Sequence, residues 1–165
     1  MNNGKWQVAN GKWKSQSGFT LAELLIAMAI FATLAGIATM SLVGAKQRTS
    51  LNTSIETLSA DLRHQQLKSM VGDTGGRATP DQYGIHFGNS EYTLFYGSTF
   101  NLLEGSNFTV QLGDNITFVS SPSDLIFNRV SGELSSGGDI VLRDNTTKAT
   151  KTLQYNKYGV VTSVN

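Results

Sequence analysis

Glu23 is the residue of this chain whose position most needs a chemical explanation. It is a carboxylate at the start of an apolar block, with Phe19 before it and an uncharged run from Leu24 to Ala45 after it. A carboxylate at the edge of a membrane-spanning segment costs free energy unless it has a partner, so Glu23 is a candidate functional residue. The alternative is a carboxylate that simply lies at the lipid headgroup boundary.

The rest of the chain shows no pattern typical of a catalytic or metal site. Cysteine is absent, which excludes disulfides, thiol catalysis and cysteine-ligated metals. His64 and His86 are isolated from each other, and no Gly-x-Ser-x-Gly or His-Glu-x-x-His spacing occurs. Asp139, Asp144 and Asn145 could offer oxygen ligands to Ca²⁺, but such residues are common in turns. We therefore expect no enzymatic activity, no metal and no cofactor.

The uncharged run is long enough to cross a membrane. As a helix, the segment from Leu24 to Ala45 would measure about 33 Å at ~1.5 Å per residue, and the apolar core of a bilayer is ~30 Å thick. A buried core helix is one alternative. A secretory signal peptide is the other, but its apolar region is typically shorter. We expect a single transmembrane helix over residues 19–45.

Residues 1–18 form a basic segment ahead of this helix. They contain Lys5, Lys12 and Lys14 and no acidic residue. This bias predicts that the N-terminus lies in the cytoplasm and the C-terminal bulk outside. The sequence Asn-Gly-Lys-Trp occurs twice, starting at Asn3 and at Asn10. The alternative to a targeting segment is that the repeat is duplicated filler or reflects a start codon placed too early.

The sequence GFTLAELL, which begins at Gly18, resembles the processing signal of type IV prepilins and pseudopilins. The resemblance rests on a small residue, a phenylalanine, a glutamate at the fifth position after the bond, and an apolar run behind a basic leader. It implies cleavage between Gly18 and Phe19 by a prepilin peptidase, removal of residues 1–18, and N-methylation of the new Phe19 amine. It also implies that Glu23 pairs with the Phe19 amine of a neighbouring subunit in a filament.

Beyond the apolar run, the pattern is that of an amphipathic helix followed by strands. Leu51, Ile55, Leu58 and Leu62 follow the 4-3-4 spacing of one helix face, and Gly72 opens a glycine-rich stop. From residue 83 onward, short apolar or alternating runs separated by turn residues predict antiparallel strands. The expected strands are Tyr83–Phe87, Tyr92–Tyr96, Phe108–Leu112, Ile116–Val119, Leu125–Phe127, Asp139–Arg143, Thr150–Tyr155 and Val160–Val164.

These patterns predict an α+β, pilin-like fold. We expect residues 46–71 to continue the membrane helix as an amphipathic helix, and residues 72–165 to form a β-rich head. The apolar stripe of the helix is the natural cover for one face of an antiparallel sheet.

The C-terminal third resembles the head of GspH/FimT-like pseudopilins and minor pilins. The residues that carry this resemblance are Ile126-Phe127, Gly132, Asp139–Leu142, Thr152–Asn156 and Tyr158–Val161. With the N-terminal signal, it implies a minor pilin or pseudopilin of a type IV pilus or a type II secretion pseudopilus. Such a chain is anchored in the bacterial inner membrane, and its partners are prepilin peptidase and other pilin subunits.

DNA binding in natural transformation is the alternative function that the same resemblance brings. It requires a basic patch, and Lys and Arg do concentrate in the C-terminal third. However, acidic residues interleave with them, and no arginine follows Gly159, unlike the tail of DNA-binding members. The balance of 13 Lys+Arg against 12 Asp+Glu gives no global signal for nucleic acid. We therefore favour a structural subunit. The basic residues concerned are Arg129, Arg143, Lys148, Lys151 and Lys157.

Overall fold

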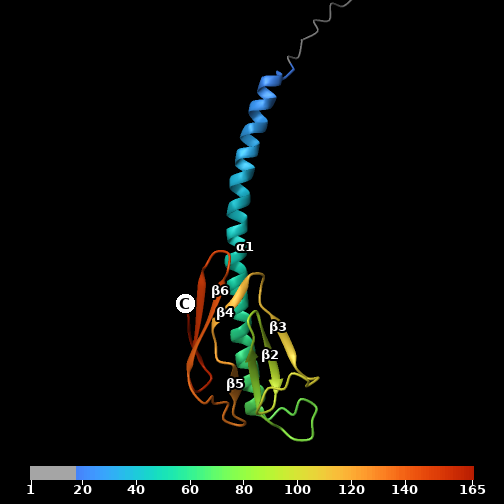
Figure 1. The fold of residues 1–165 in the computed structure, drawn as a ribbon, viewed down its shortest axis with the longest axis vertical. Helices are drawn as coiled ribbons and strands as arrows, with labels where there is room; N and C mark the ends of the chain where they lie inside the picture. Colours follow the sequence, from blue (N-terminus) through green and yellow to red (C-terminus); the bar gives the residue numbers. More distant parts are fainter. Residues whose placement is uncertain (1–17) are drawn as a thin grey trace, which may run out of the picture. The chain divides into compact units, whose positions relative to one another are not determined.

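The computed structural model describes residues 18–165, and among these the side chains of all residues except 40–44 and 47–48. Lys5, Lys12 and Lys14 of the predicted leader lie outside the described residues. Two compact units are distinguished, Met1–Met40 and Ser41–Asn165. The elements, drawn in Figure 1, are α1 (Leu21–Val71), β1 (Tyr83–Phe87), β2 (Glu91–Tyr96), β3 (Phe108–Gln111), β4 (Ile116–Ser120), β5 (Asp124–Phe127), β6 (Gly138–Asp144), β7 (Thr150–Tyr155) and β8 (Val161–Val164).

The expected α+β architecture is confirmed: a long N-terminal helix is followed by antiparallel sheets. Each predicted strand is present, and its ends differ from the expected ones by no more than one residue. The agreement is close because glycine and asparagine turns separate the apolar runs so clearly.

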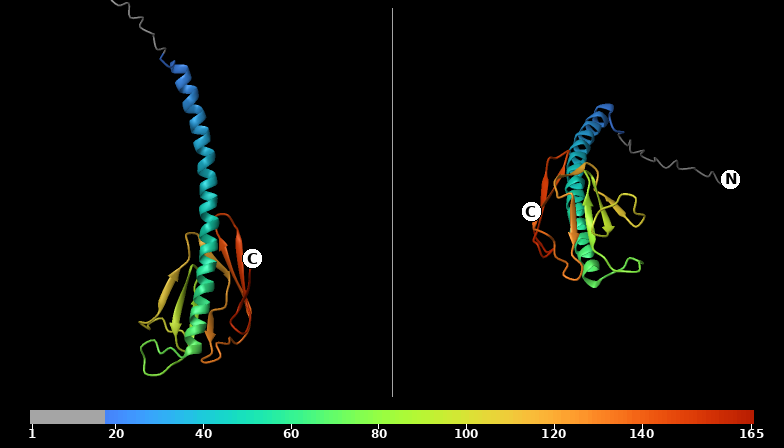
Figure 2. Two further views of the ribbon diagram at one scale, coloured as in Figure 1. Left: turned by 180° about the vertical axis from the view of Figure 1, so that it is seen from behind. Right: turned by 60° about the horizontal axis from the view of Figure 1, so that its bottom comes forward.

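The sequence predicts antiparallel strands and does not specify how many sheets they form. The strands form two four-stranded sheets, β3-β2-β1-β5 and β4-β6-β7-β8, with every pairing antiparallel. Figure 2 shows one sheet on each side of the second half of α1. The stripe of α1 therefore covers two sheet faces rather than one. The reason is that β4 pairs with β6, not with β5, its neighbour in the chain.

The stripe of α1 lies in one core that both sheets share. Leu51, Ile55, Leu58 and Leu62 are at most 3% exposed. They pack with Ile85 and Phe127 of the first sheet and with Ile140, Leu142 and Leu153 of the second. Burial of this apolar surface is the main free-energy gain that holds the helix to the sheets.

The same stripe continues with two polar residues. Gln65 and Ser69 keep the 4-3-4 spacing and are 2% and 0% exposed. Ser69 Oγ donates to the Phe127 carbonyl at 2.7 Å, so its burial leaves no unpaired hydroxyl.

Gln66, which lies beside the stripe, bonds the helix to two loops of the head. Its side-chain amide donates to the Gly132 and Tyr158 carbonyls at 3.0 and 2.6 Å. These bonds tie the last turns of α1 to the loops beneath them.

A glycine motif ends α1 at the predicted position. Gly72 has φ of +67°, a left-handed conformation that L-residues with a side chain rarely adopt. The Gly72 N–H donates to the Ser69 carbonyl at 3.4 Å, and the Asp73 N–H donates to the Lys68 carbonyl at 3.0 Å. This pair of bonds is a Schellman motif, which satisfies carbonyls that the helix end would otherwise leave free.

A hydrogen bond between Tyr92 and Asp61 links β2 to α1. The Tyr92 hydroxyl donates to Asp61 Oδ2 at 2.6 Å, and Tyr92 is 1% exposed. Burial of Tyr92, its hydrogen bond to Asp61 and the negative charge of that carboxylate all raise the pKa of the tyrosine far above its usual range. Tyr92 therefore remains a neutral donor in the folded chain.

Val130 holds a strained conformation at the surface. Its φ is +73°, although it is β-branched, and its side chain is 71% exposed. Its N–H donates to the Ser69 carbonyl at 3.1 Å, which keeps the loop in place. For an L-residue, a left-handed conformation costs roughly 1–2 kcal/mol.

Replacing Val130 with glycine should therefore stabilise the protein. We expect Val130→Gly to raise the free energy of unfolding by about 1 kcal/mol, since glycine removes the strain but adds backbone entropy to the unfolded chain. Val130→Ala is the matched control, because it removes the branched side chain and keeps Cβ. Chemical denaturation of the detergent-solubilised chain measures both. A glycine variant no more stable than the alanine variant would show that the left-handed backbone carries no strain.

Candidate functional site

The start of α1 is built from Thr20 and Glu23. The Thr20 N–H and the Thr20 hydroxyl both donate to Glu23 Oε2 at 2.9 Å. In return, the Glu23 N–H donates to Thr20 Oγ1 at 3.2 Å. This reciprocal arrangement is a capping box, in which two side chains satisfy backbone N–H groups that a helix N-terminus leaves free.

The capping box gives Glu23 a role that our sequence analysis missed. The spacing Thr-x-x-Glu before an apolar run could have revealed it. Both hydrogen bonds from Thr20 go to Oε2, and Oε1 accepts none from the described residues. The carboxylate thus caps its own helix with one oxygen and keeps the other available to a second donor.

The bond between Gly18 and Phe19 lies ahead of the helix. Neither residue is part of α1, both are exposed, and Phe19 is 89% exposed. A Cβ placed on Gly18 would meet nothing within 4 Å. The described chain therefore leaves this peptide bond open to an enzyme.

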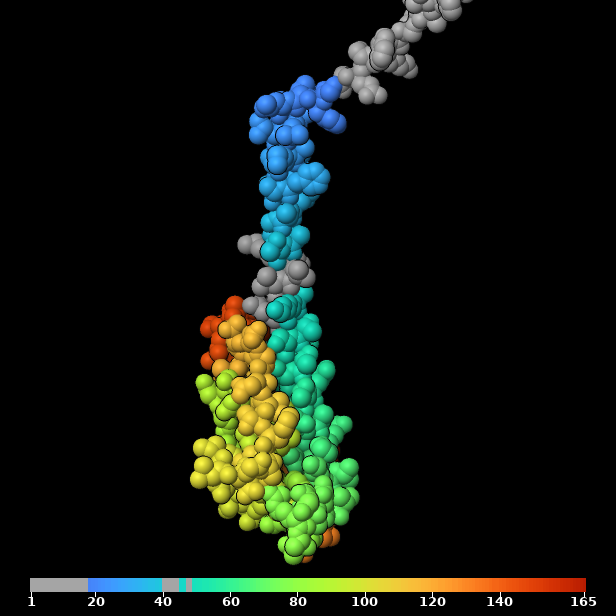
Figure 3. All heavy atoms as spheres, turned by 90° about the vertical axis from the view of Figure 1, so that its right-hand side faces the viewer, coloured from blue at the N-terminus to red at the C-terminus, as the bar shows by residue number. Residues whose placement is uncertain are grey.

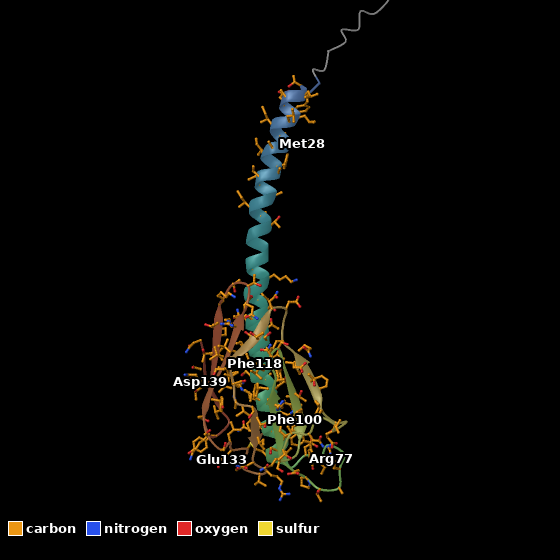
Figure 4. All side chains as sticks on the ribbon, viewed as in Figure 1. Met28, Arg77, Phe100, Phe118, Glu133 and Asp139 are labelled. Carbon is orange, nitrogen blue, oxygen red and sulfur yellow. The ribbon has the colours of Figure 1, made fainter. Side chains whose placement is uncertain are left out.

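The helix that follows is apolar and uncovered. The segment Leu21–Thr39 has a mean hydropathy of 2.2 and no buried residue, and it is the single helix of the described chain that is long and apolar enough to cross a membrane. Its exposed apolar side chains, such as Met28 in Figure 4, extend around the whole helix. An apolar surface on all sides suits lipid or neighbouring apolar helices, not water.

Comparison with known protein families gives one match, to the family model described as "Prokaryotic N-terminal methylation motif", over residues 13–39. This motif indicates a type IV pilin- or pseudopilin-like precursor. It implies processing by prepilin peptidase and assembly with other pilins, and it is typical of structural subunits rather than enzymes. No curated protein and no solved structure matches the chain.

The prepilin-like signal accounts for the residues singled out at the N-terminus of the helix. The matched range contains Gly18, Phe19 and Glu23 and part of the basic leader. Together with the single apolar helix, it fits a membrane-anchored chain. Cleavage at Gly18–Phe19, methylation of Phe19 and the charge pair with Glu23 stay predictions, as does the GspH/FimT-like assignment of the head.

The histidines and acidic residues do not form a metal site among the described residues. As expected, His64 lies in α1 and His86 in β1. His86 Nδ1 is 2.8 Å from Asp124 Oδ1. Asp144 accepts the N–H groups of Thr146 and Thr147 at 2.7 and 3.0 Å, so its carboxylate closes the turn after β6.

The basic residues considered for DNA contact come from several elements. Arg143 lies in β6, Lys151 in β7, and the remaining three in loops. Arg129 donates to the Pro80 carbonyl at 3.2 Å, and Lys157 Nζ lies 4.9 Å from the centre of the Tyr158 ring. DNA contact by the head stays the untested alternative to a structural role.

Proposed function

We propose that this chain is a minor pilin or pseudopilin, a structural subunit of a type IV pilus or a type II secretion pseudopilus. The observation that carries the proposal is the prepilin-like signal, whose Gly18–Phe19 bond is exposed directly ahead of an uncovered apolar helix. The β-rich unit has its own apolar core, so the helix can serve for anchoring and assembly while the head faces other partners.

Processing converts the precursor into the form that assembles. Hydrolysis of the Gly18–Phe19 bond adds water across it, so that Gly18 ends in a carboxylate on the released leader and Phe19 gains a free amine. Methylation of that amine keeps its positive charge. The mature chain then begins with a cation one turn from Glu23.

Glu23 can serve its own helix and a neighbouring subunit at once. Its Oε2 accepts the two hydrogen bonds from Thr20, and Oε1 can accept the methylated Phe19 amine of the next subunit. Each charge offsets the desolvation of the other among apolar helices, and an unpaired one would cost several kcal/mol. The pair therefore fixes the register in which subunits stack, more than it adds general stability.

Mass spectrometry of the N-terminus tests the proposed processing. Protein extracted from membranes of cells with an active prepilin peptidase should give a peptide that begins with N-methylated Phe19. The same peptide without the methyl group should appear if a methyl donor is withheld from a purified reaction. An N-terminus that still contains Trp13 in such cells would contradict the proposal.

A further inference from the structure

Strand β3 forms an open edge of the first sheet. Among the described strands it pairs with β2 alone. The Leu112 N–H donates to the Ser90 carbonyl at 2.9 Å. Because backbone groups in an antiparallel pair point alternately toward and away from the partner, Val110 also bonds to β2. The N–H and C=O groups of Thr109 and Gln111 therefore point to the open side.

The other edge strands, β5, β4 and β8, have features that discourage pairing with a further strand. Strand β3 has no such feature. The pairings of β4 with β6 and of β7 with β8 each contain a register shift, and β5 begins with the charged Asp124. Bulges and charges are the usual ways of protecting an edge. The sequence of β3, Phe-Thr-Val-Gln, has neither charge nor proline, and its pairing with β2 is regular.

Two hollows lie between this edge and α1, on the side of the molecule that Figure 3 presents, and we call the two together the groove. One hollow of about 330 Å³ lies between Thr53 and Thr57 of α1 and Val110 of β3. A second, of about 400 Å³, lies between His64 of α1 and Phe108 of β3. Phe108 is 65% exposed, so the apolar face of the sheet continues beyond what the helix covers.

The second hollow is lined by the cations Lys68 and Arg77 and by the carboxylate of Asp61, which already accepts the Tyr92 hydroxyl. Lys68 Nζ lies 5.3 Å from the centre of the Tyr83 ring and has no ion-pair partner among the described residues. Arg77, labelled in Figure 4, lies over Tyr96 and is already paired with a carboxylate. Gln65 is 2% exposed, and its Oε1 lacks a hydrogen-bond donor in the part of the chain that is described. The hollow thus offers a free cation and an unsatisfied acceptor.

We propose that the groove between α1 and β3 binds an extended peptide segment of a partner protein. The segment adds to β3 as a further strand and bonds to the free backbone groups of Thr109 and Gln111. Its alternate side chains enter the two hollows, and an acidic side chain lies next to Lys68. Serine and threonine line the helix side of the groove, which suits the polar backbone of a strand better than an apolar helix. This inference does not depend on the N-terminal signal.

Binding of a labelled peptide to the full chain in detergent micelles tests the proposal. The probe is an alternating Thr-Val peptide of about eight residues that ends in glutamate, with a lysine-ended peptide as control. Fluorescence anisotropy reports binding, and hydrogen exchange reports protection of the Thr109 and Gln111 amides. We expect the glutamate peptide to bind and to protect both amides. The absence of binding at about 1 mM peptide would overturn the proposal.

Substitutions at Gln111 separate strand addition from other modes of binding. Gln111→Pro removes an outward N–H and keeps the bonds between β3 and β2, since proline is tolerated on an edge strand. Gln111→Ala is the matched control, because it loses the same side-chain contact to Glu91 and keeps the N–H. We expect the proline variant to bind about tenfold more weakly than the alanine variant. The two thermal melts should agree, and equal binding by both would overturn strand addition.

Charge reversal at Lys68 tests the acidic position. Lys68→Glu should weaken binding of the glutamate peptide and favour the lysine-ended peptide, whereas an unchanged preference would remove the acidic side chain from the proposal. Self-association is the outcome that would assign the groove to a second copy of this chain. Dimers that form without peptide and disappear in Gln111→Pro, measured by light scattering, would overturn the assignment to a different protein.

Discussion

Gly18→Val should leave the precursor uncut in the membrane, still carrying its basic leader. The described chain gives no reason for this variant to misfold, because Gly18 precedes the helix and a Cβ there meets nothing within 4 Å. The obstacle arises in the peptidase, whose cleft must accept an extended backbone next to the scissile bond. Glycine presents no side chain to that cleft, and valine presents a branched one. We expect the cleaved fraction to fall from nearly all of the protein to almost none.

Gly18→Ala is the graded control for this experiment. Alanine adds a single carbon, so its processing should be slower than that of the wild type and faster than that of the valine variant. The ratio of precursor to mature chain in membranes, followed over time after a pulse label, measures all three. Normal maturation of Gly18→Val would mean that the cleavage site lies elsewhere. Precursor of Gly18→Val that is recovered outside the membrane fraction would indicate failed membrane insertion instead of a block at the peptidase.

The secondary structure could be predicted because its signals are local. The spacing of Leu51, Ile55, Leu58 and Leu62 specifies one helix face, and Gly72 ends the helix through its left-handed backbone. Turn residues set the strand ends in the same way. Each of these signals depends on residues a few positions apart in the sequence.

The division of the strands into two sheets could not be predicted, because it depends on contacts between distant segments. Nothing local to β4 distinguishes pairing with β5 from pairing with β6, which begins 18 residues after β4 ends. The apolar stripe on α1 indicates that this face of the helix is buried. It does not indicate whether one sheet or two sheets bury it. The open edge at β3 follows from the same long-range choice, so the sequence could not have identified the groove beside it.

For the candidate site at the helix N-terminus, we identified the motif from the sequence and missed the capping box. The motif around Gly18, Phe19 and Glu23 could be recognised from the sequence. The capping box between Thr20 and Glu23 is equally local, because the spacing Thr-x-x-Glu before an apolar run predicts it. The two roles have different requirements: the cap needs an acceptor oxygen, and the subunit pair needs a negative charge.

Glu23→Gln and Glu23→Ala together should show which of these roles governs assembly. Glutamine can replace glutamate in a capping box, so Glu23→Gln keeps the cap and removes the charge. Glu23→Ala removes both, at a cost for the lost cap of about 0.5–2 kcal/mol in the first turn of the helix. Because the apolar core of the head contains no residue before Leu51, both variants should be cleaved, inserted and as thermally stable in the head as the wild type.

We expect both substitutions to reduce recovery of partner pilin subunits, measured by pull-down from detergent extracts, by about tenfold or more. The reason is that either variant leaves the Phe19 amine of a neighbouring subunit unpaired among apolar helices, and an uncompensated charge there costs several kcal/mol. The alanine variant should be slightly worse than the glutamine variant, by the contribution of the cap. Wild-type recovery with Glu23→Gln and a loss with Glu23→Ala would assign Glu23 to the helix cap alone. In that case the subunits must find their register through the apolar surface of Leu21–Thr39, and the free oxygen Oε1 of Glu23 has no role in assembly.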